Sequence, residues 1–308
     1  MQEEKNMKVG FVGLGNMGFN MVNNLIKGGF EVYTYDVFEK AIQRTEEIGA
    51  HGCKSLQELA ENSEVIQIMV MNYAQVKSVV LDEGGLMHHM KPGSILNVSS
   101  TVSPEQTKSV AEMVAEKGIE YVDCPVSGGK TGAINGELII MAACKDEVFT
   151  RVEPMFRAMG KHDTYHVSTI IGNGQVMKSI NQVMIATNMA IDAEAVTYAV
   201  KSGLNPQDIY TVIGKCTGCS DVFRDKLPQI MNRDFEVRGQ IDIFLKDLSI
   251  ALDIGKQVKS PMFMSALTLQ VFNWASACGY GQQDLAALVR AYEDCAHTVV
   301  DKDANKRA

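Results

Sequence analysis

A lysine near the middle of the chain stands where it could exchange protons with a ligand. Lys178 lies within residues 172–182, whose sequence GNGQVMKSINQ places apolar residues on both sides of it. Residues three and four positions apart share one face of a helix, so Asn181 and Gln182 flank the direction of Lys178. Such a lysine either extends its ammonium group to solvent or is partly desolvated, with a lowered pKa that suits acid–base chemistry. The spacing leaves both interpretations open.

A glycine-rich segment near the start of the chain has the pattern of a phosphate-binding turn. It consists of Gly13, Leu14, Gly15, Asn16, Met17 and Gly18, and it follows an apolar run and opens an amphipathic one. In such a turn the first glycine permits the sharp bend, the second admits a pyrophosphate, and the third lets helix and strand pack closely. The pyrophosphate rests on the free N–H groups at the start of the helix.

An acidic residue stands where this motif requires one. Asp36 ends the second expected strand, 18 residues after Gly18, where its carboxylate can bind the ribose hydroxyls of an adenosine. Val37 and Phe38 follow it, so no arginine stands there to hold a 2′-phosphate. The sequence therefore predicts NAD as the cofactor and makes NADP the less favoured alternative.

A second turn of small residues could receive an anionic ligand. Ser127, Gly128 and Gly129 follow shortly after an expected strand at residues 119–122. Their hydroxyl and backbone N–H groups would form a small concavity that suits a carboxylate. An ordinary strand-ending turn, with glycines for geometry alone, explains the same residues equally well.

These segments need elements that position them, and the hydrophobic pattern supplies two kinds. Strands are expected at residues 8–12, 31–36, 64–69, 94–98, 119–122, 138–142 and 163–167, with helices between them that include 17–27, 39–48 and 104–117. From about residue 172 only helical periodicity remains, with further helices at 221–231, 241–258, 261–278 and 284–298. We therefore predict an α/β protein, with a Rossmann-type doubly wound parallel sheet at residues 1–168. An all-α domain at residues 169–308 follows, entered through a long helix at about residues 175–201.

The composition excludes several classes of protein. The chain has 308 residues, 46% of them hydrophobic, which suffices for the cores of about two domains. A net charge of −8 and a pI of about 5.3 argue against nucleic-acid or anionic-membrane partners. No apolar run suits a membrane span, and the polar N-terminus does not resemble a signal peptide. Seven scattered cysteines predict free thiols in a cytoplasmic protein, and no residues have the spacing of metal ligands.

Four stretches together resemble the β-hydroxyacid dehydrogenase family, which includes 3-hydroxyisobutyrate dehydrogenases and tartronate semialdehyde reductases. They are FVGLGNMGFNMVNNL at 11–25, DCPVSGGKTGAINGEL at 123–138, GNGQVMKSINQ at 172–182 and IDIFLKDLSIAL at 241–252. They span almost the whole chain in the family's order, with most likeness to the tartronate semialdehyde reductase and 2-(hydroxymethyl)glutarate dehydrogenase branches. The resemblance implies NAD-dependent hydride transfer between a small anionic 3-hydroxy acid and its semialdehyde, in a homodimer or homotetramer.

The resemblance also implies roles for individual residues, in a cleft between the two domains. Lys178 would be the general acid/base, and Asn181 or Gln182 would orient the reacting oxygen. The substrate carboxylate would be bound by Ser127, Gly128 and Gly129, with Ser127 counted in the catalytic set. The expected cofactor contacts beyond the glycine turn and Asp36 are Met71, Asn72, Thr101 and Lys246.

Two other functions compete with this prediction. A nucleotide-binding scaffold without turnover would keep the fold but would have no need of Lys178. A reductase of bulkier or sulfonated aldehydes would keep the chemistry, but a sulfonate site is expected to carry an arginine near Ser127, and none is present there. Lys178 also argues against the related imine reductases and non-catalytic reader proteins, which lack it.

Overall fold

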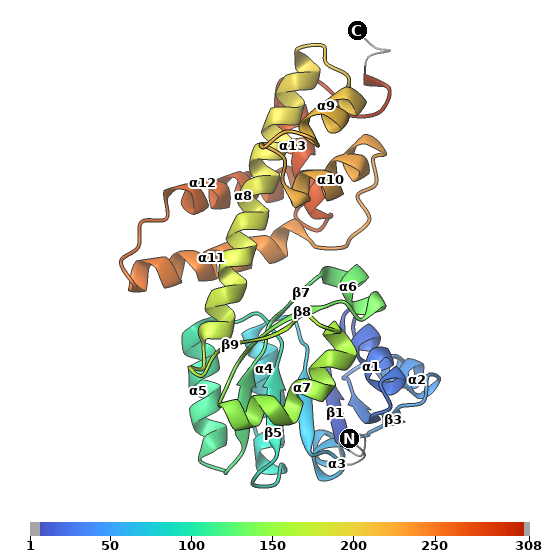
Figure 1. Cartoon of the computed structure of the whole chain (residues 1–308), viewed down its shortest axis with the longest axis vertical. Helices are drawn as coiled ribbons and strands as arrows, with labels where there is room; N and C mark the ends of the chain where they lie inside the picture. The colour runs from blue at the N-terminus through green and yellow to red at the C-terminus, as the bar shows by residue number, and fades with distance from the viewer. Residues whose placement is uncertain (1–6, 305–308) are drawn as a thin grey trace. The chain divides into compact units, whose positions relative to one another are not determined.

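The computed structural model describes residues 7–304 of the chain (Figure 1). The chain divides into two compact units, Met1–Lys178 and Ser179–Ala308. The division falls inside the long helix α8 (Asn173–Lys201), so the long helix expected at about residues 175–201 is confirmed. The boundary that we predicted between residues 168 and 169 lies shortly before the start of this helix.

The first unit is built on one sheet in which most strands run parallel. The strand order is β3-β2-β1-β4-β5-β6-β8-β7, and β9 pairs with β8. The strands are β1 (Lys8–Val12), β2 (Glu31–Tyr35), β3 (His51–Gly52), β4 (Val65–Ile68), β5 (Ile95–Val98), β6 (Glu120–Asp123), β7 (Val126–Ser127), β8 (Ile139–Ala143) and β9 (Thr164–Ser168). The chain adds strands first on one side of β1 and then on the other, which confirms the doubly wound arrangement. β8 and β9 are the exceptions, because β8 runs antiparallel to β6 and β7, and β9 runs parallel to β8.

Helices cover both faces of this sheet, so its strands bury side chains on both sides. The helices are α1 (Gly18–Lys27), α2 (Glu39–Glu46), α3 (Leu56–Glu61), α4 (Tyr73–Val80), α5 (Pro104–Ala115), α6 (Gly129–Asn135), α7 (Asp146–Gly160) and the short 3₁₀ helix η2 (Leu86–His88). Phe11 of β1 belongs to one apolar cluster with Phe156 of α7, and Ile66 of β4 belongs to another with Val110 of α5. Each such side chain contributes about 1.5–3 kcal/mol by burial, which explains why the central strands β1, β4 and β5 are mostly apolar.

Capping residues determine where individual helices begin. The hydroxyl of Ser103 accepts a hydrogen bond from the backbone N–H of Gln106, and the Gln106 side chain accepts one from the N–H of Ser103. Pro104 occupies the first helical position, where its missing N–H costs nothing. These two bonds fix the start of α5, immediately after the loop that contains Thr101.

The second unit consists of helices joined by loops over residues 179–304, as expected. Beyond α8 it contains α9 (Pro206–Ile213), α10 (Asp221–Met231), α11 (Ile241–Gln257), α12 (Phe263–Ala275), the π-helical turn η3 (Ser276–Tyr280), η4 (Leu285–Ala287) and α13 (Leu288–Ala296). Met189 and Val196 on α8 share its core with Leu227, Leu248 and Phe272 of the following helices. None of the helices in the described part of the chain combines the length and apolar character needed to cross a membrane.

Candidate functional site

The glycine-rich turn has the backbone geometry that a phosphate-binding turn requires. Gly13 has a φ of +94°, which strains any residue with a side chain, and a Cβ on Gly18 would overlap the carbonyl oxygen of Gly13. Gly15, by contrast, has nothing within 4 Å of the position that a Cβ would take. The first and third glycines are therefore required by the chain itself, and the second leaves open space over the backbone. That space fits the pyrophosphate of a dinucleotide.

Asp36 is fixed by two hydrogen bonds, one of them from this turn. One carboxylate oxygen accepts from the backbone N–H of Leu14 at 2.7 Å, and the other accepts from the N–H of Phe38 at 3.0 Å. Each carboxylate oxygen has a second lone pair, so the group can still accept hydrogen bonds from ribose hydroxyls. Val37 and Phe38 are exposed beside it. Sequence reasoning did not identify one cation near the turn, Arg44. Its guanidinium is 4.4 Å from the ring centroid of Phe19, the residue that follows Gly18.

Most of the predicted cofactor residues in the first unit follow the carboxyl ends of parallel strands. The turn at 13–18 follows β1, Asp36 follows β2, Met71 and Asn72 follow β4, and Thr101 follows β5. The carboxyl ends of parallel strands meet at one edge of a sheet, so the fold brings these segments to one edge. Met71 is exposed there, whereas the Asn72 side chain caps α4 by accepting from the N–H of Gln75 at 3.0 Å.

The small-residue turn begins a short helix that is tied to the start of the chain. Ser127 ends β7, and Gly128 and Gly129 have φ values of +114° and +57° before α6 continues. The buried side chain of Asn24 on α1 donates to the carbonyl oxygen of Ala133 in α6 at 2.6 Å. The helix that starts at the glycine-rich turn therefore also holds the segment that we expect to bind the substrate carboxylate.

A buried carboxylate, which sequence reasoning did not single out, connects the end of β6 to the start of α8. Asp123 ends β6 and is fully buried. It accepts hydrogen bonds from the backbone N–H groups of Gly172 and Gln175 and, at 2.7 Å, from the side-chain amide of Gln175. Burial raises the pKa of Asp123 to about 6, and these hydrogen bonds oppose the rise. The signal in the sequence was an acidic residue directly after the strand expected at residues 119–122.

The predicted acid/base lies one turn further along α8. Only 8% of the Lys178 surface is exposed, which favours the desolvated interpretation over a side chain extended into solvent. Asn181 and Gln182 follow in the second unit, and the Asn181 amide donates to the Gln182 side-chain oxygen at 3.4 Å. Gln182 is buried and donates to Asp247 at 2.6 Å.

Lys246 lies in the second unit, next to the partner of Gln182. Its amino group is 2.8 Å from a carboxylate oxygen of Asp247, which is buried on α11. Asp247 therefore joins α8, through Gln182, to the lysine that we expect to reach the cofactor. Both ends of the Gln182 amide are engaged within the unit.

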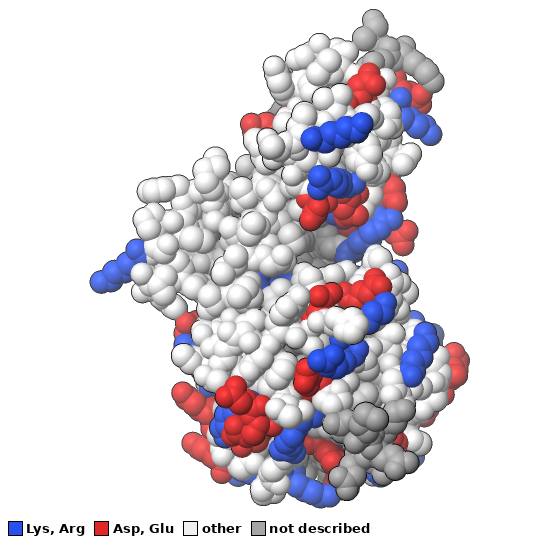
Figure 2. All heavy atoms as spheres, viewed as in Figure 1, with Lys and Arg blue, Asp and Glu red and all other residues white. Residues whose placement is uncertain are grey.

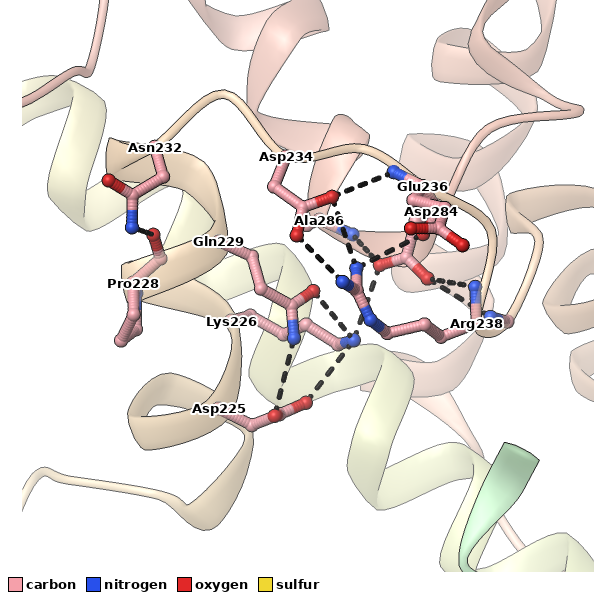
Figure 3. A network of polar contacts seen from close by, with 11 residues as sticks. Asp225, Lys226, Pro228, Gln229, Asn232, Asp234, Glu236, Arg238, Asp284 and Ala286 are labelled. Carbon is pink, nitrogen blue, oxygen red and sulfur yellow. Dashed lines mark hydrogen bonds and ion pairs between the residues drawn. The ribbon is translucent and has the colours of Figure 1, made fainter. Parts of the chain in front are cut away.

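The second unit also contains a buried ionic cluster that the sequence did not predict (Figure 3). Asp284 is fully buried and accepts from the backbone N–H groups of Arg238, Gly239 and Ala286. The amino group of Lys226 lies 3.2 Å from Asp284 and also 3.2 Å from Asp225. These contacts hold the segment after α10 against the start of η4. They supply a structural role and leave Asp284 few lone pairs for a ligand.

No group of three histidine, cysteine or acidic side chains that could hold a metal ion occurs among residues 7–304. All seven cysteines are free, including the pair Cys216 and Cys219 in the loop after α9. The expectation of free thiols is therefore confirmed.

Comparison with known proteins agrees with a dinucleotide-binding site. Residues 8–172 match the family described as "NAD binding domain of 6-phosphogluconate dehydrogenase", and residues 172–292 match "NAD-binding of NADP-dependent 3-hydroxyisobutyrate dehydrogenase". The chain is 38% identical to 2-(hydroxymethyl)glutarate dehydrogenase of Eubacterium barkeri over 94% of its own length and 96% of that protein. It is 32% identical to L-threonate dehydrogenase of Cupriavidus necator over 92% of its length and 95% of that protein.

A solved structure has the same fold. The crystal structure of 3-hydroxyisobutyrate dehydrogenase from Salmonella typhimurium superimposes with a TM-score of 0.85 at 32% identity, covering 92% of this chain and 99% of that one. Fold, site and comparisons define an oxidoreductase with a nicotinamide dinucleotide cofactor. The chain belongs to the β-hydroxyacid dehydrogenase family, as the four sequence stretches predicted.

Proposed function

We propose that this protein interconverts a small 3-hydroxy acid and its semialdehyde, with NAD as the preferred cofactor and Lys178 as the general acid/base. The observation that carries the proposal is the burial of Lys178 on α8, in the unit that also presents the glycine-rich turn and Asp36. Two of the relatives support the substrate class by name. 2-(Hydroxymethyl)glutarate and 3-hydroxyisobutyrate both carry a primary alcohol on the carbon next to the one that bears a carboxylate.

The residues at the sheet edge would hold the cofactor. The turn at 13–18 would hold the pyrophosphate, and Asp36 the adenosine ribose. Met71, Asn72, Thr101 and Lys246 would contact the remainder of the cofactor. The nicotinamide ring, when bound, accepts or supplies the hydride. The exposed apolar Val37 and Phe38 beside Asp36 support NAD, because neither can pair with a 2′-phosphate.

The chain's own contribution to the chemistry is to move one proton at a defined position. In oxidation the amine of Lys178 would take the proton of the substrate hydroxyl, while the hydride leaves the carbon atom that bears this hydroxyl. In reduction its ammonium group would return that proton to the aldehyde oxygen. A positioned acid/base contributes typically about 10²–10⁴-fold to a rate. The low exposure of Lys178 would also limit competition by water.

The substrate would be oriented at its two polar ends. Ser127, Gly128 and Gly129 would bind the carboxylate shared by the whole substrate class. Asn181 is the better candidate for the reacting oxygen, because Gln182 is engaged with Asp247. The engagement of Gln182 supports a positioning role for it instead.

The competing functions have less support. A scaffold without turnover does not account for a buried lysine at this place, and the relatives named above are dehydrogenases. A sulfonate reductase still lacks its arginine near Ser127. We further propose a cytoplasmic enzyme, which the free cysteines support.

A homodimer or homotetramer completes the proposal. Met184, Ile191 and Tyr198 recur every seven residues along α8 and are exposed, as are Phe263 and Leu267 on α12. Figure 2 shows an area over α12 that is almost without charged residues. Exposed apolar surface of this kind commonly marks a contact with another protein chain.

The test is turnover followed by nicotinamide absorbance. The purified protein receives NADH or NADPH with a panel of three- to six-carbon semialdehydes, and NAD or NADP with the matching 3-hydroxy acids and L-threonate. We expect turnover with at least one semialdehyde and a higher kcat/KM with NADH than with NADPH. Turnover of L-threonate alone would move the protein to another substrate class. Binding of neither cofactor would refute the proposed function.

A further inference from the structure

Three segments that the proposed chemistry requires converge on one pair of buried side chains. Asp123 ends β6, four residues before Ser127 of the substrate turn, and Gln175 lies in the first turn of α8. Both are buried, with 0% and 1% of their surfaces exposed. Their shortest contact is the hydrogen bond from the Gln175 amide to the Asp123 carboxylate at 2.7 Å.

Asp123 caps the start of α8. The first N–H groups of a helix have no partner within the helix, and in α8 one Asp123 oxygen accepts from Gly172 at 3.1 Å and from Gln175 at 3.2 Å. The fit is tight, because a Cβ on Gly174 would lie 2.8 Å from that same oxygen and 2.8 Å from the carbonyl oxygen of Met141. The close packing therefore fixes the position of the first turn of α8 against the strands that carry Asp123 and Met141.

Gln175 extends the same contact to the loop after β5. Its side-chain oxygen accepts from the N–H of Val102 at 3.1 Å, and its amide donates to the carbonyl oxygen of Ser100 at 3.2 Å. These two groups flank Thr101, the residue expected to contact the cofactor ribose. One side chain thus binds the backbone on both sides of Thr101 while its own backbone begins the helix that carries Lys178.

We propose that Asp123 and Gln175 are positioning residues, which fix the first turn of α8 and so set the place of the Lys178 amino group relative to the Thr101 loop. This inference rests on the proposed function of Lys178. Neither residue needs to touch substrate or cofactor. A shift of about 1 Å in a reacting group can reduce a rate by about 100-fold, so a displaced helix turn is sufficient to impair turnover.

Two substitutions break the hydrogen bond between Gln175 and Asp123 while keeping side chains of similar size. In Asp123→Asn the side chain keeps an oxygen for the helix N–H groups but can no longer accept from Gln175 without a rearrangement. In Gln175→Met a side chain of similar length loses all three of its hydrogen bonds. The matched control is Tyr121→Phe, on the same strand, which removes a buried hydroxyl that contacts Thr107 at 2.7 Å.

We expect kcat to fall by about 100-fold in Asp123→Asn and in Gln175→Met, with the Kd for NADH within about twofold of the wild type in Asp123→Asn. The kcat of the double variant should be no lower than that of the slower single variant, because both substitutions break the same contact between Asp123 and Gln175. Tyr121→Phe should keep its kcat. A kcat within twofold of the wild type in both single variants, or an equal loss in Tyr121→Phe, would overturn the positioning role.

A pH profile in the direction of aldehyde reduction adds a readout that a merely structural role would not change. Low pH keeps Lys178 protonated, as reduction requires, so a fall in kcat below about pH 6 would report protonation of Asp123, whose pKa burial raises to about 6. This acid limb should be present in Tyr121→Phe and absent in Asp123→Asn. Its persistence in Asp123→Asn would overturn the assignment.

Other ionisable groups near Asp123 are distinguishable from it. The pKa values of Tyr121, Cys124 and Cys144 are all raised by burial, away from the acid limb. The side chain of Lys108 on α5 lies close to Gly172, and His166 on β9 binds the carbonyl oxygen of Cys144. The variants Lys108→Met and His166→Gln should keep the acid limb, and its loss in either would reassign it.

Chemical labelling separates failure of this inference from failure of the proposed function. Acetic anhydride labels amino groups, and mass spectrometry then gives a rate for each lysine without any turnover. We expect the labelling rate of Lys178 to change at least threefold in Asp123→Asn and to stay constant in Tyr121→Phe, with Lys201 constant in both. An unchanged Lys178 rate would overturn the positioning role even in an active enzyme. A changed rate would support it even if no panel substrate reacts.

Discussion

The substitution Asp123→Asn should remove one pH-dependent component of the protein's stability. Burial raises the pKa of Asp123 from its ordinary value of 3.8 to about 6, so the folded chain binds this proton more tightly than the unfolded chain does. Stability is therefore greatest below the unfolded pKa and is lost as the pH rises through about 6. The full shift corresponds to about 3 kcal/mol, of which about 2 kcal/mol is lost between pH 4 and pH 7.

The assay is urea unfolding of wild type and Asp123→Asn at several pH values from 4 to 7. Far-UV circular dichroism reports both units, whereas the single tryptophan, Trp274 on α12, reports the second unit. Coincident curves justify a two-state free energy, and separate curves isolate the transition of the first unit. Asparagine does not titrate, so the difference between the two proteins isolates Asp123 from every other group.

We expect the wild type to lose about 2 kcal/mol relative to the variant as the pH rises across this range. A difference that grows in favour of the wild type would mean that the backbone N–H groups of α8 outweigh burial and depress the pKa. A constant difference would mean that Asp123 ionises alike in the folded and unfolded chains. Either result would refute the balance of forces inferred for this carboxylate.

Three further predictions follow from other parts of the molecule. Asp36→Ala should raise the Kd for NADH by about 10-fold or more and reduce the preference over NADPH, measured by nicotinamide fluorescence; an unchanged preference would contradict the role of Asp36. Asp284→Asn should lower the free energy of unfolding by about 2–3 kcal/mol, because it removes the buried charged partner of Lys226 and leaves this amine only the more exposed Asp225, yet keep the kcat of the folded enzyme; full stability would contradict the structural role of this cluster. Ile191→Asp should reduce the oligomer in analytical ultracentrifugation, and a persistent oligomer would place the interface elsewhere.

The features predictable from the sequence are those that depend on short stretches of chain. The glycine-rich turn after an apolar run determines both its own backbone and the start of α1. The second strand, expected at residues 31–36 from the alternation of side chains, is observed as β2 one residue shorter, so that Asp36 follows it directly. The helices of the second unit begin and end within a few residues of the expected positions, as in α10 (Asp221–Met231) and α11 (Ile241–Gln257). Local periodicity is sufficient for each of these.

The features that the sequence left out depend on contacts between distant residues. Asn24 and Ala133 are 109 positions apart, and Asp123 and Gln175 are 52 apart. No local pattern indicates which strand end will receive a helix start. The antiparallel direction of β8 was missed for the same reason, because periodicity identifies a strand but not its neighbour. The two-residue strands β3 and β7 are too short to produce any alternation.

The measurement that tests the central claim most directly compares two lysines of the same helix. Lys178→Ala and Lys201→Ala are assayed for semialdehyde reduction and for NADH binding; Lys201 is the exposed last residue of α8. We predict that Lys178→Ala loses about 10²–10⁴-fold in kcat and still binds NADH, while Lys201→Ala matches the wild type. If Lys178→Ala kept more than a tenth of the wild-type kcat, another group would have to move the proton, and Lys178 would not be the general acid/base.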